Sequence, residues 1–105
     1  MMKNGMRPVH PGEVLREDYL KPLRMSANAL ARQLRVPASR INDIVLERRG
    51  VTADTALRLS RYFGGDAQSW LTLQTRFDLR SAELDEVLQA TLRTVEPRQG
   101  ELESV

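Results

Sequence analysis

The stretch ANALARQLRVPASRINDIV, residues 27–45, contains two short helical patterns that are separated by only three or four residues. Each pattern repeats apolar residues at the spacing of one helix face: Leu30, Ala31 and Leu34 in the first, and Ile41, Ile44 and Val45 in the second. So short a turn makes the two helices cross steeply, and the small side chain of Ala31 permits their backbones to approach. With Val36 filling the angle between them, the pair is predicted to form a helix-turn-helix unit.

Residues that cap or break helices divide the rest of the chain into further helical segments. Three have a side-chain oxygen that can accept from free N–H groups at a helix N-terminus: Ser26, Thr52 and Asp66. Pro37 suits the start of the second helix of the unit, because its missing N–H is not needed there. Pro22 is expected to end or strain the first helix, and helix ends are expected at Gly50 and at the Gly64-Gly65 pair.

Apolar residues recur at helical spacing in these segments as well. The expected inward residues are Val14, Leu15, Tyr19, Leu20 and Leu23; then Ala56, Leu57, Leu59 and Tyr62 or Phe63; then Trp70, Leu71, Leu73 and Phe77; and last Leu84, Val87, Leu88 and Leu92. We therefore predict an all-α fold, a bundle of five to six helices. Its expected parts are an extended segment over residues 1–11, a domain over 12–80, and a C-terminal helix and tail over 81–105.

The sequence offers little for catalysis or for metal binding. It has no cysteine, and its one histidine, His10, lies in a proline-flanked segment that we expect outside the helical core, with a structural role. Neighbouring acids such as Glu17 and Asp18 point apart on a helix and form no catalytic pair. We predict a protein that is not an enzyme and has no cofactor, metal site or catalytic residue. No apolar run reaches the roughly 18 residues of a membrane span, so we expect a cytoplasmic protein without a membrane partner.

Charge is distributed unevenly along the chain. Residues 1–63 contain 12 Lys and Arg against 6 Asp and Glu, whereas residues 64–105 contain 4 against 8. Of the 16 basic residues, 14 are arginine, whose planar guanidinium suits phosphates and guanine edges. The basic part indicates a polyanionic partner, although a solvated surface would also account for many of these arginines.

The second helix of the unit is expected to expose the side chains that read bases in a DNA major groove. Arginine can bond guanine through two atoms, asparagine can do the same for adenine, and a small hydroxyl reaches a base or a phosphate. Ser39, Arg40 and Asn42 are therefore the expected base-reading residues. Phosphate contacts come from helix N-termini and from nearby polar or cationic side chains. The whole expected DNA-binding set is Asn28, Pro37, Ser39, Arg40, Asn42, Arg48 and Arg49.

Several longer motifs resemble a known family. Residues 26–52 resemble the helix-turn-helix of Xre/Cro-type repressors, which implies a lambda-repressor-like fold. The motifs HPGE, RIN, TADTALRLSRYFG and WLTLQ, spread over about residues 7–79, are similar to those of the HigA branch, the antitoxins of HigBA toxin–antitoxin systems. Residues after about Ser81 exceed the shortest members of the family, so the resemblance assigns them no role.

That resemblance implies a homodimer that represses its own operon at a palindromic operator in double-stranded DNA, through a recognition helix over residues 37–46. It also implies that the protein neutralises a HigB-type toxin, a messenger-RNA endonuclease, by binding it. A dimer would cover the apolar surplus expected around Trp70, Leu71 and Phe77, the expected dimer interface. Two alternatives stay open: a stand-alone or phage-type repressor without a toxin partner, and a protein-interaction module that does not bind DNA.

Overall fold

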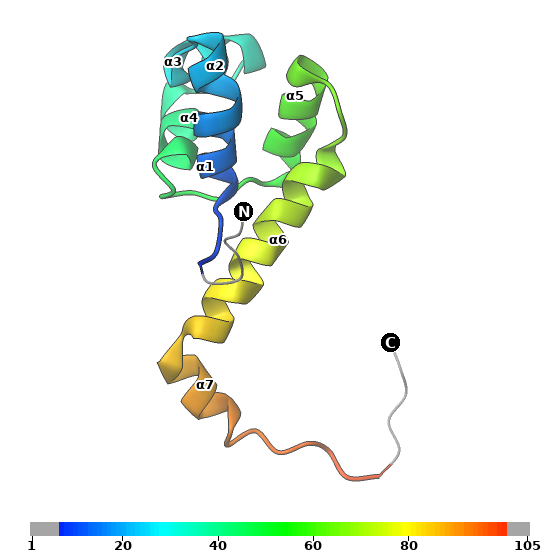
Figure 1. Ribbon diagram of the computed structural model, residues 1–105. Coiled ribbons are helices and arrows are strands. Elements are labelled where there is room, and N and C mark those ends of the chain that lie inside the picture. Colours follow the sequence, from blue (N-terminus) through cyan, green and yellow to red (C-terminus); the bar gives the residue numbers. More distant parts are fainter. Residues whose placement is uncertain (1–6, 101–105) are drawn as a thin grey trace.

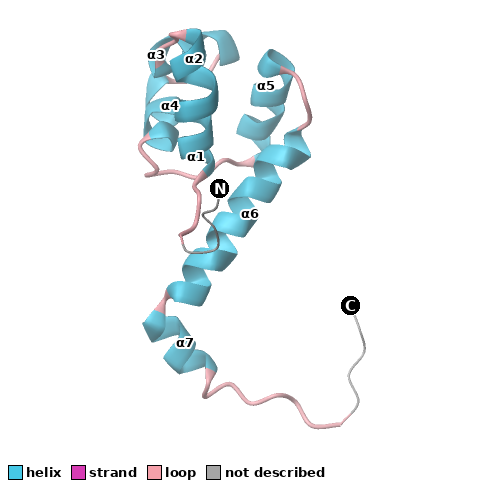
Figure 2. Cartoon of the chain, in the orientation of Figure 1, coloured by secondary structure: helices cyan, strands magenta, loops and turns pink. Residues whose placement is uncertain are grey.

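Helices make up the architecture of residues 7–100, the part of the chain that the computed structural model describes, and no strand occurs among them (Figures 1 and 2). In chain order the helices are α1 (Pro11–Val14), the π-helical segment η1 (Leu15–Leu20), α2 (Lys21–Leu23), α3 (Ala27–Leu34), α4 (Ala38–Val45), α5 (Ala53–Phe63), α6 (Ala67–Leu84) and α7 (Glu86–Leu92). Because α1, η1 and α2 follow one another without a break, they act as one helix. The predicted all-α bundle of five to six helices is confirmed.

The expected N-terminal caps are confirmed. The Ser26 hydroxyl accepts from the Ala29 N–H at 3.0 Å, and the Asp66 carboxylate accepts from the Ser69 N–H at 2.8 Å. Thr52 makes the corresponding bond at the start of α5, at a longer 3.5 Å. These caps satisfy N–H groups that the helices themselves leave free, and so they fix where α3, α5 and α6 begin.

The first helix does not end at Pro22, and the helix end expected at Gly50 lies earlier in the chain. The first helix continues past Pro22 to Leu23, since the preceding π-helical turn already uses wider hydrogen bonds, such as the one from the Lys21 N–H to the Arg16 carbonyl. Helix α4, the expected recognition helix, ends at Val45, and the left-handed residue that follows it is Glu47 (φ 63°) rather than Gly50. The Gly64-Gly65 stop after α5 is confirmed, with both residues at positive φ.

The core forms where the first helix and α3 to α6 meet. Its buried side chains are Leu15, Leu20, Leu30, Ala31, Leu34, Ile41, Ile44, Val45, Val51, Ala56, Leu59 and Trp70. Two leucines of the α1–α5 part that are predicted to point inward are instead exposed, Leu23 by 56% and Leu57 by 62%. The whole set predicted to point inward further along the chain is exposed as well: Leu84, Val87, Leu88 and Leu92. Leu57 points outward because Ala56 and Leu59 occupy the inner face of α5.

Helices α6 and α7 carry the chain away from the core, which gives the molecule an elongated outline of 54 × 28 × 26 Å (Figure 1). The boundary expected after residue 80 falls within α6, which continues to Leu84. Along this extension five large apolar side chains are exposed: Leu79, Leu84, Val87, Leu88 and Leu92. We call them the α6–α7 apolar surface. The expected N-terminal segment and tail lie partly outside the described residues, at 1–6 and 101–105.

None of the helices described between residues 7 and 100 is both long enough and apolar enough to cross a membrane.

Candidate nucleic-acid interface

Helices α3 and α4 form the predicted helix-turn-helix. The side chain of Ala31, 1% exposed, lies at the crossing, where Ile41 and Ile44 of α4 are fully buried against the core. The turn between the helices is closed by a bond of 3.0 Å from the Val36 N–H to the Ala31 carbonyl, and Arg35 adopts a left-handed conformation there (φ 63°). This packing buries one face of α4 and leaves the opposite face toward solvent.

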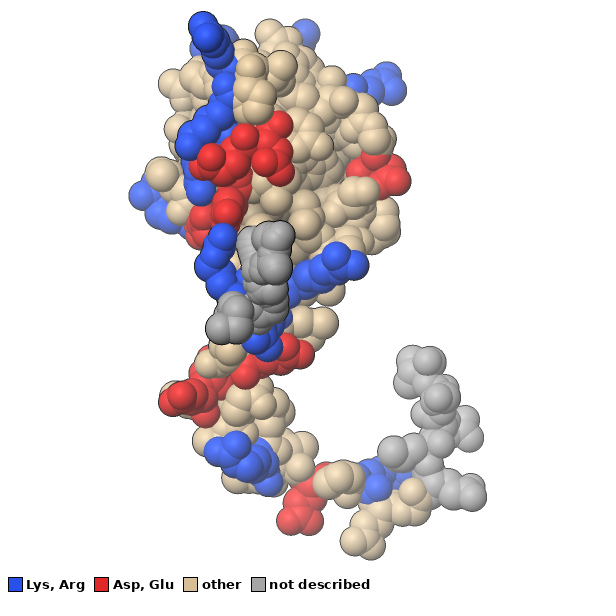
Figure 3. All heavy atoms as spheres, in the orientation of Figure 1, with Lys and Arg blue, Asp and Glu red and all other residues tan. Residues whose placement is uncertain are grey.

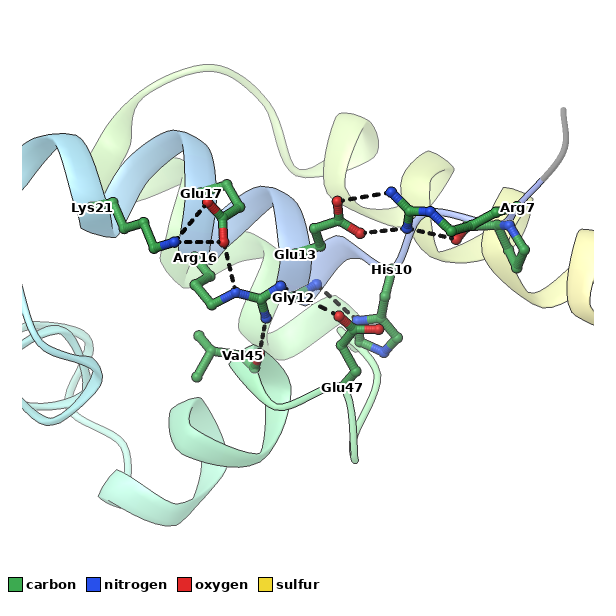
Figure 4. A network of polar contacts seen from close by, with 10 residues as sticks. Arg7, His10, Gly12, Glu13, Arg16, Glu17, Lys21, Val45 and Glu47 are labelled. Carbon is green, nitrogen blue, oxygen red and sulfur yellow. Dashed lines mark hydrogen bonds and ion pairs between the residues drawn. The ribbon is translucent and has the colours of Figure 1, made fainter. Parts of the chain in front are cut away.

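The first helix anchors the C-terminal end of α4 by direct backbone contact. A Cβ atom added to Gly12 would stand 1.8 Å from the Ile44 carbonyl oxygen, so only glycine allows the two helices to come this close. The Arg16 guanidinium donates to the Val45 carbonyl and lies 3.5 Å from the Glu47 carboxylate (Figure 4). A cation at the carbonyl end of a helix is stabilising, and here it also ties α4 to the first helix.

His10 belongs to this anchor, and the expectation that it lies outside the helical core is wrong. The imidazole is only 3% exposed, and its Nδ1 accepts from the Gly12 N–H at 2.8 Å, which caps the first helix. Its ring meets that of Phe77 edge-on, with centroids 4.7 Å apart. Burial lowers the pKa of His10, against a weaker opposing effect of Glu47 and Asp78, so the neutral ring is favoured.

The exposed face of α4 brings two of the expected residues into contact. The Asn42 amide donates to the side-chain oxygen of Asn28 at 2.7 Å and to the Ala38 carbonyl at 2.8 Å. Ser39 is exposed next to this pair, and Pro37 is the N-cap residue of α4. The start of α3 and the start of α4 therefore present one joined polar surface.

The loop arginines after α4 fold back onto it. Arg48 lies 3.1 Å and Arg49 lies 3.7 Å from the carboxylate of Asp43, and both arginine side chains remain about half exposed or more. Among the described residues, Asp43 thus pairs with these two arginines, whereas Arg40 pairs with another aspartate. The loop is held beside the recognition helix with both guanidinium groups near solvent.

A second aspartate, which the sequence analysis did not single out, holds Arg40. The Oδ1 atom of Asp54, on the first turn of α5, lies 2.7 Å from the Arg40 guanidinium and 2.7 Å from that of Arg58. These two hydrogen bonds, that from Arg58 first, lower the pKa of Asp54 and keep it ionised. The Asp54–Arg58 spacing of four residues on a helix was the available signal, whereas the bond to Arg40 joins two helices and has no local signature.

Arg40 and Arg49 also share a small pocket of about 220 Å³ at the N-terminus of α5. Its lining consists of Arg40, Arg49, Gly50, Thr52, Asp54 and Thr55. Two guanidinium groups beside a helix N-terminus form an environment that suits a phosphate, with the Asp54 carboxylate as the one opposing charge in the lining.

The charge asymmetry of the sequence follows the long axis of the molecule. Figure 3 shows Lys and Arg side chains along one edge of the α1–α5 part, with an acidic group beside them, and further acidic side chains where α6 passes into α7. The positive end is thus the one that contains the exposed face of α4.

Of the expected dimer residues, Trp70 lies within the chain's own core, whereas Leu71 and Phe77 are partly exposed. Trp70 is 5% exposed and its ring packs 5.4 Å from that of Tyr19, so it offers no surplus surface. Leu71 packs against the core, and Phe77 against His10. The apolar surplus that the sequence indicates is real, but it lies further along the chain, on the α6–α7 apolar surface.

Comparisons with known proteins agree with this geometry. The helix-turn-helix family matches residues 17–70 of the chain. Virulence-associated protein I of Dichelobacter nodosus is 68% identical over 83 residues, which cover 79% of this chain and 77% of that protein. The structure of Pseudomonas aeruginosa antitoxin HigA with the higBA promoter is 45% identical, with a TM-score of 0.80 and coverage of 87% of this chain and 98% of that one.

A third relative is antitoxin GraA in complex with its operator, 47% identical with a TM-score of 0.81 over 95% of this chain and 100% of that one. Identity at this level over nearly whole chains accompanies a shared fold and the same order of helices. The chain therefore belongs to the Xre-type helix-turn-helix family, within its group of HigA antitoxins.

Proposed function

We propose that this protein is an antitoxin that binds a palindromic operator in double-stranded DNA and represses its own operon. The observation that carries the proposal is the exposed polar face of α4, where Ser39, Arg40 and Asn42 stand beside a positively charged loop. Such a face, presented by the second helix of a helix-turn-helix, has the size and the hydrogen-bonding groups that a major groove accepts. The proposal is also supported by the relatives whose structures were solved with a promoter or an operator.

Arg40 and the pair formed by Asn28 and Asn42 have different roles within this face. Arg40 donates to Asp54 from one guanidinium nitrogen, Nη1, and keeps its other N–H donors for a guanine edge. Asn42 has both amide N–H groups engaged, so its oxygen is left to accept from a base amino group. The amide of Asn28 keeps its N–H groups for a phosphate. Arg48 and Arg49 fix the register through the backbone of the DNA.

The proposal includes a homodimer formed through the α6–α7 apolar surface. Exposed leucines and valines on two successive helices are a strong reason for a second copy to cover them. Two-fold symmetry would place the two α4 helices about 34 Å apart, one turn of DNA, so that each reads one half of a palindrome.

The antitoxin part of the proposal is that the protein neutralises a HigB-type toxin by binding it. Membership of the HigA group supports this role. Residues 64–105 contain more acidic than basic side chains and so complement a basic RNA-cleaving partner. Opposite charges on two proteins accelerate their association. The antitoxin acts by occupying its partners and performs no reaction of its own.

A fluorescence anisotropy titration tests the DNA-binding role. The purified protein and its Arg40→Ala variant are titrated onto the duplex upstream of the gene and onto a random duplex, each at two salt concentrations. We expect specific binding that weakens steeply with salt, and a loss of about 1–3 kcal/mol per half-site in the variant. Arg76→Ala, an exposed arginine on α6, is the matched control and should bind as the unchanged protein does. Equal affinity for both duplexes would refute the repressor.

Binding of the toxin is tested separately by calorimetry with the product of the neighbouring gene. We expect a stable complex that protects messenger RNA from cleavage, and Arg40→Ala should leave this complex unaffected because it alters only the DNA-facing surface. Specific operator binding without a toxin complex would instead establish a stand-alone repressor.

A further inference from the structure

Asp54 connects the three helices around the DNA-facing surface without lying on the recognition helix. Its Oδ1 atom is 2.7 Å from Arg40 of α4 and 2.7 Å from Arg58 of its own helix. Arg58 in turn donates to the Leu34 carbonyl at 2.7 Å, at the C-terminal end of α3. We propose that Asp54 is a specificity-determining positioning residue, which holds the Arg40 guanidinium in the orientation for reading a base. This inference rests on the proposed function and deepens it.

The anchoring by Arg58 is what makes Asp54 able to position another side chain. An exposed aspartate with a single arginine partner keeps several rotamers, and such a pair contributes little. Here the guanidinium of Arg58 is fixed at one end by the Leu34 carbonyl and at the other by Asp54, so the carboxylate has a defined place. Arg40, whose side chain is 28% exposed, is held in turn. A chain of contacts thus links the backbone of α3 through Arg58 and Asp54 to Arg40, the arginine proposed to read the DNA.

Holding Arg40 in place has a direct consequence for recognition. A free arginine side chain loses rotamer freedom when it bonds a base, and it can choose a phosphate instead. A guanidinium that is already oriented avoids most of that loss at the matching guanine, and it cannot turn freely to a phosphate of any sequence. The contact to Asp54 therefore favours the specific complex over the non-specific one.

The negative charge of Asp54 has a second, separate effect, which is on overall affinity for DNA. Its side chain is 55% exposed and lines the pocket at the N-terminus of α5, where a phosphate would approach Arg40 and Arg49. A carboxylate in that position repels the phosphate backbone of every sequence alike, so it lowers the affinity for the operator and for a random duplex together. The ratio of the two affinities then depends on how well Arg40 is oriented.

Two substitutions separate orientation from charge. Asp54→Asn keeps the shape and an oxygen acceptor but removes the charge, whereas Asp54→Glu keeps the charge and moves the carboxylate by one methylene. The measured quantity is the ratio of the dissociation constant for a random duplex to that for the operator, at fixed salt. Asp18→Asn on the first helix, an exposed aspartate that makes no ion pair within the described residues, is the matched control for charge.

We expect Asp54→Asn to bind the random duplex more tightly and to lower the specificity ratio by about 5- to 150-fold, the equivalent of 1–3 kcal/mol for one good base contact. Asp54→Glu should lower the ratio through weaker operator binding, with unchanged affinity for the random duplex. Circular dichroism melts confirm that both variants are folded, and Asp18→Asn should leave the ratio unchanged.

The decisive measurement combines Asp54→Asn with Arg40→Ala. If Asp54 acts through Arg40, the substitution will have little further effect on operator discrimination once Arg40 is absent. If Arg40→Ala lowers the specificity ratio but Asp54→Asn and Asp54→Glu both leave it unchanged, the positioning role is overturned and the repressor function stands. The positioning role is also overturned if Asp54→Asn lowers the specificity ratio by the same factor whether or not Arg40 is present. A wild-type protein without operator preference would refute both this inference and the proposed function.

Discussion

Substitution of Gly12 by alanine tests how tightly the first helix holds the recognition helix. The new Cβ would lie 1.8 Å from the Ile44 carbonyl oxygen, about 1.6 Å short of the 3.4 Å at which ordinary contacts begin. The obstacle is backbone, so no side chain can rotate away, and the first helix or the end of α4 must move. Such overpacking costs 1–3 kcal/mol and occasionally more. We expect the upper end of that range, about 3 kcal/mol, because a clash with backbone cannot be relieved by a change of rotamer.

Urea and thermal denaturation, followed by circular dichroism at one protein concentration, measure this cost. A loss of about 3 kcal/mol corresponds to a melting temperature lower by roughly 12 °C or more in a domain of this size. Gly50→Ala is the control, since its Cβ would meet only the side-chain end of Gln74, at 2.8 Å, and that end can shift. If Gly12→Ala lies within about 0.5 kcal/mol of the unchanged protein, the backbone contact described here is wrong.

Three further perturbations follow from local contacts. Ser26→Ala removes the cap of α3 and should lower the free energy of unfolding by about 1 kcal/mol in urea titrations. Because burial holds the pKa of His10 below its ordinary value of 6.5, that free energy should stay level above this pH and fall below it, where the unfolded chain takes up the proton first. His10→Asn, which keeps a capping oxygen toward Gly12, should abolish this slope. Val87→Glu, at a 78% exposed apolar position, should shift the proposed dimer toward monomer in analytical ultracentrifugation, whereas Leu57→Glu on α5 should not.

Features that depend on a few neighbouring residues were predictable from the sequence. The caps at Ser26, Thr52 and Asp66 each require one oxygen three residues before an N–H group, which is a purely local relation. The helix-turn-helix was predictable for the same reason, because a short turn and the small Ala31 leave few ways for two helices to pack.

Features that depend on contacts between distant segments were not predictable in this way. His10 looked peripheral because its burial comes from Phe77, 67 positions later in the chain. Trp70 looked like interface because the sequence does not show that Tyr19 covers it. Asp54 escaped notice since its pairing with Arg40 depends on how α4 and α5 are arranged in space.

The separation of charge along the 54 Å axis gives the molecule a permanent electric dipole, with its positive pole at the helix-turn-helix and its negative pole toward α7. In the field of a polyanionic duplex such a dipole experiences a torque as well as an attraction. Screening confines both to about the last 8 Å of the approach at physiological ionic strength. Within that distance the protein is turned so that α4 arrives first, and fewer encounters with DNA are lost to the wrong orientation.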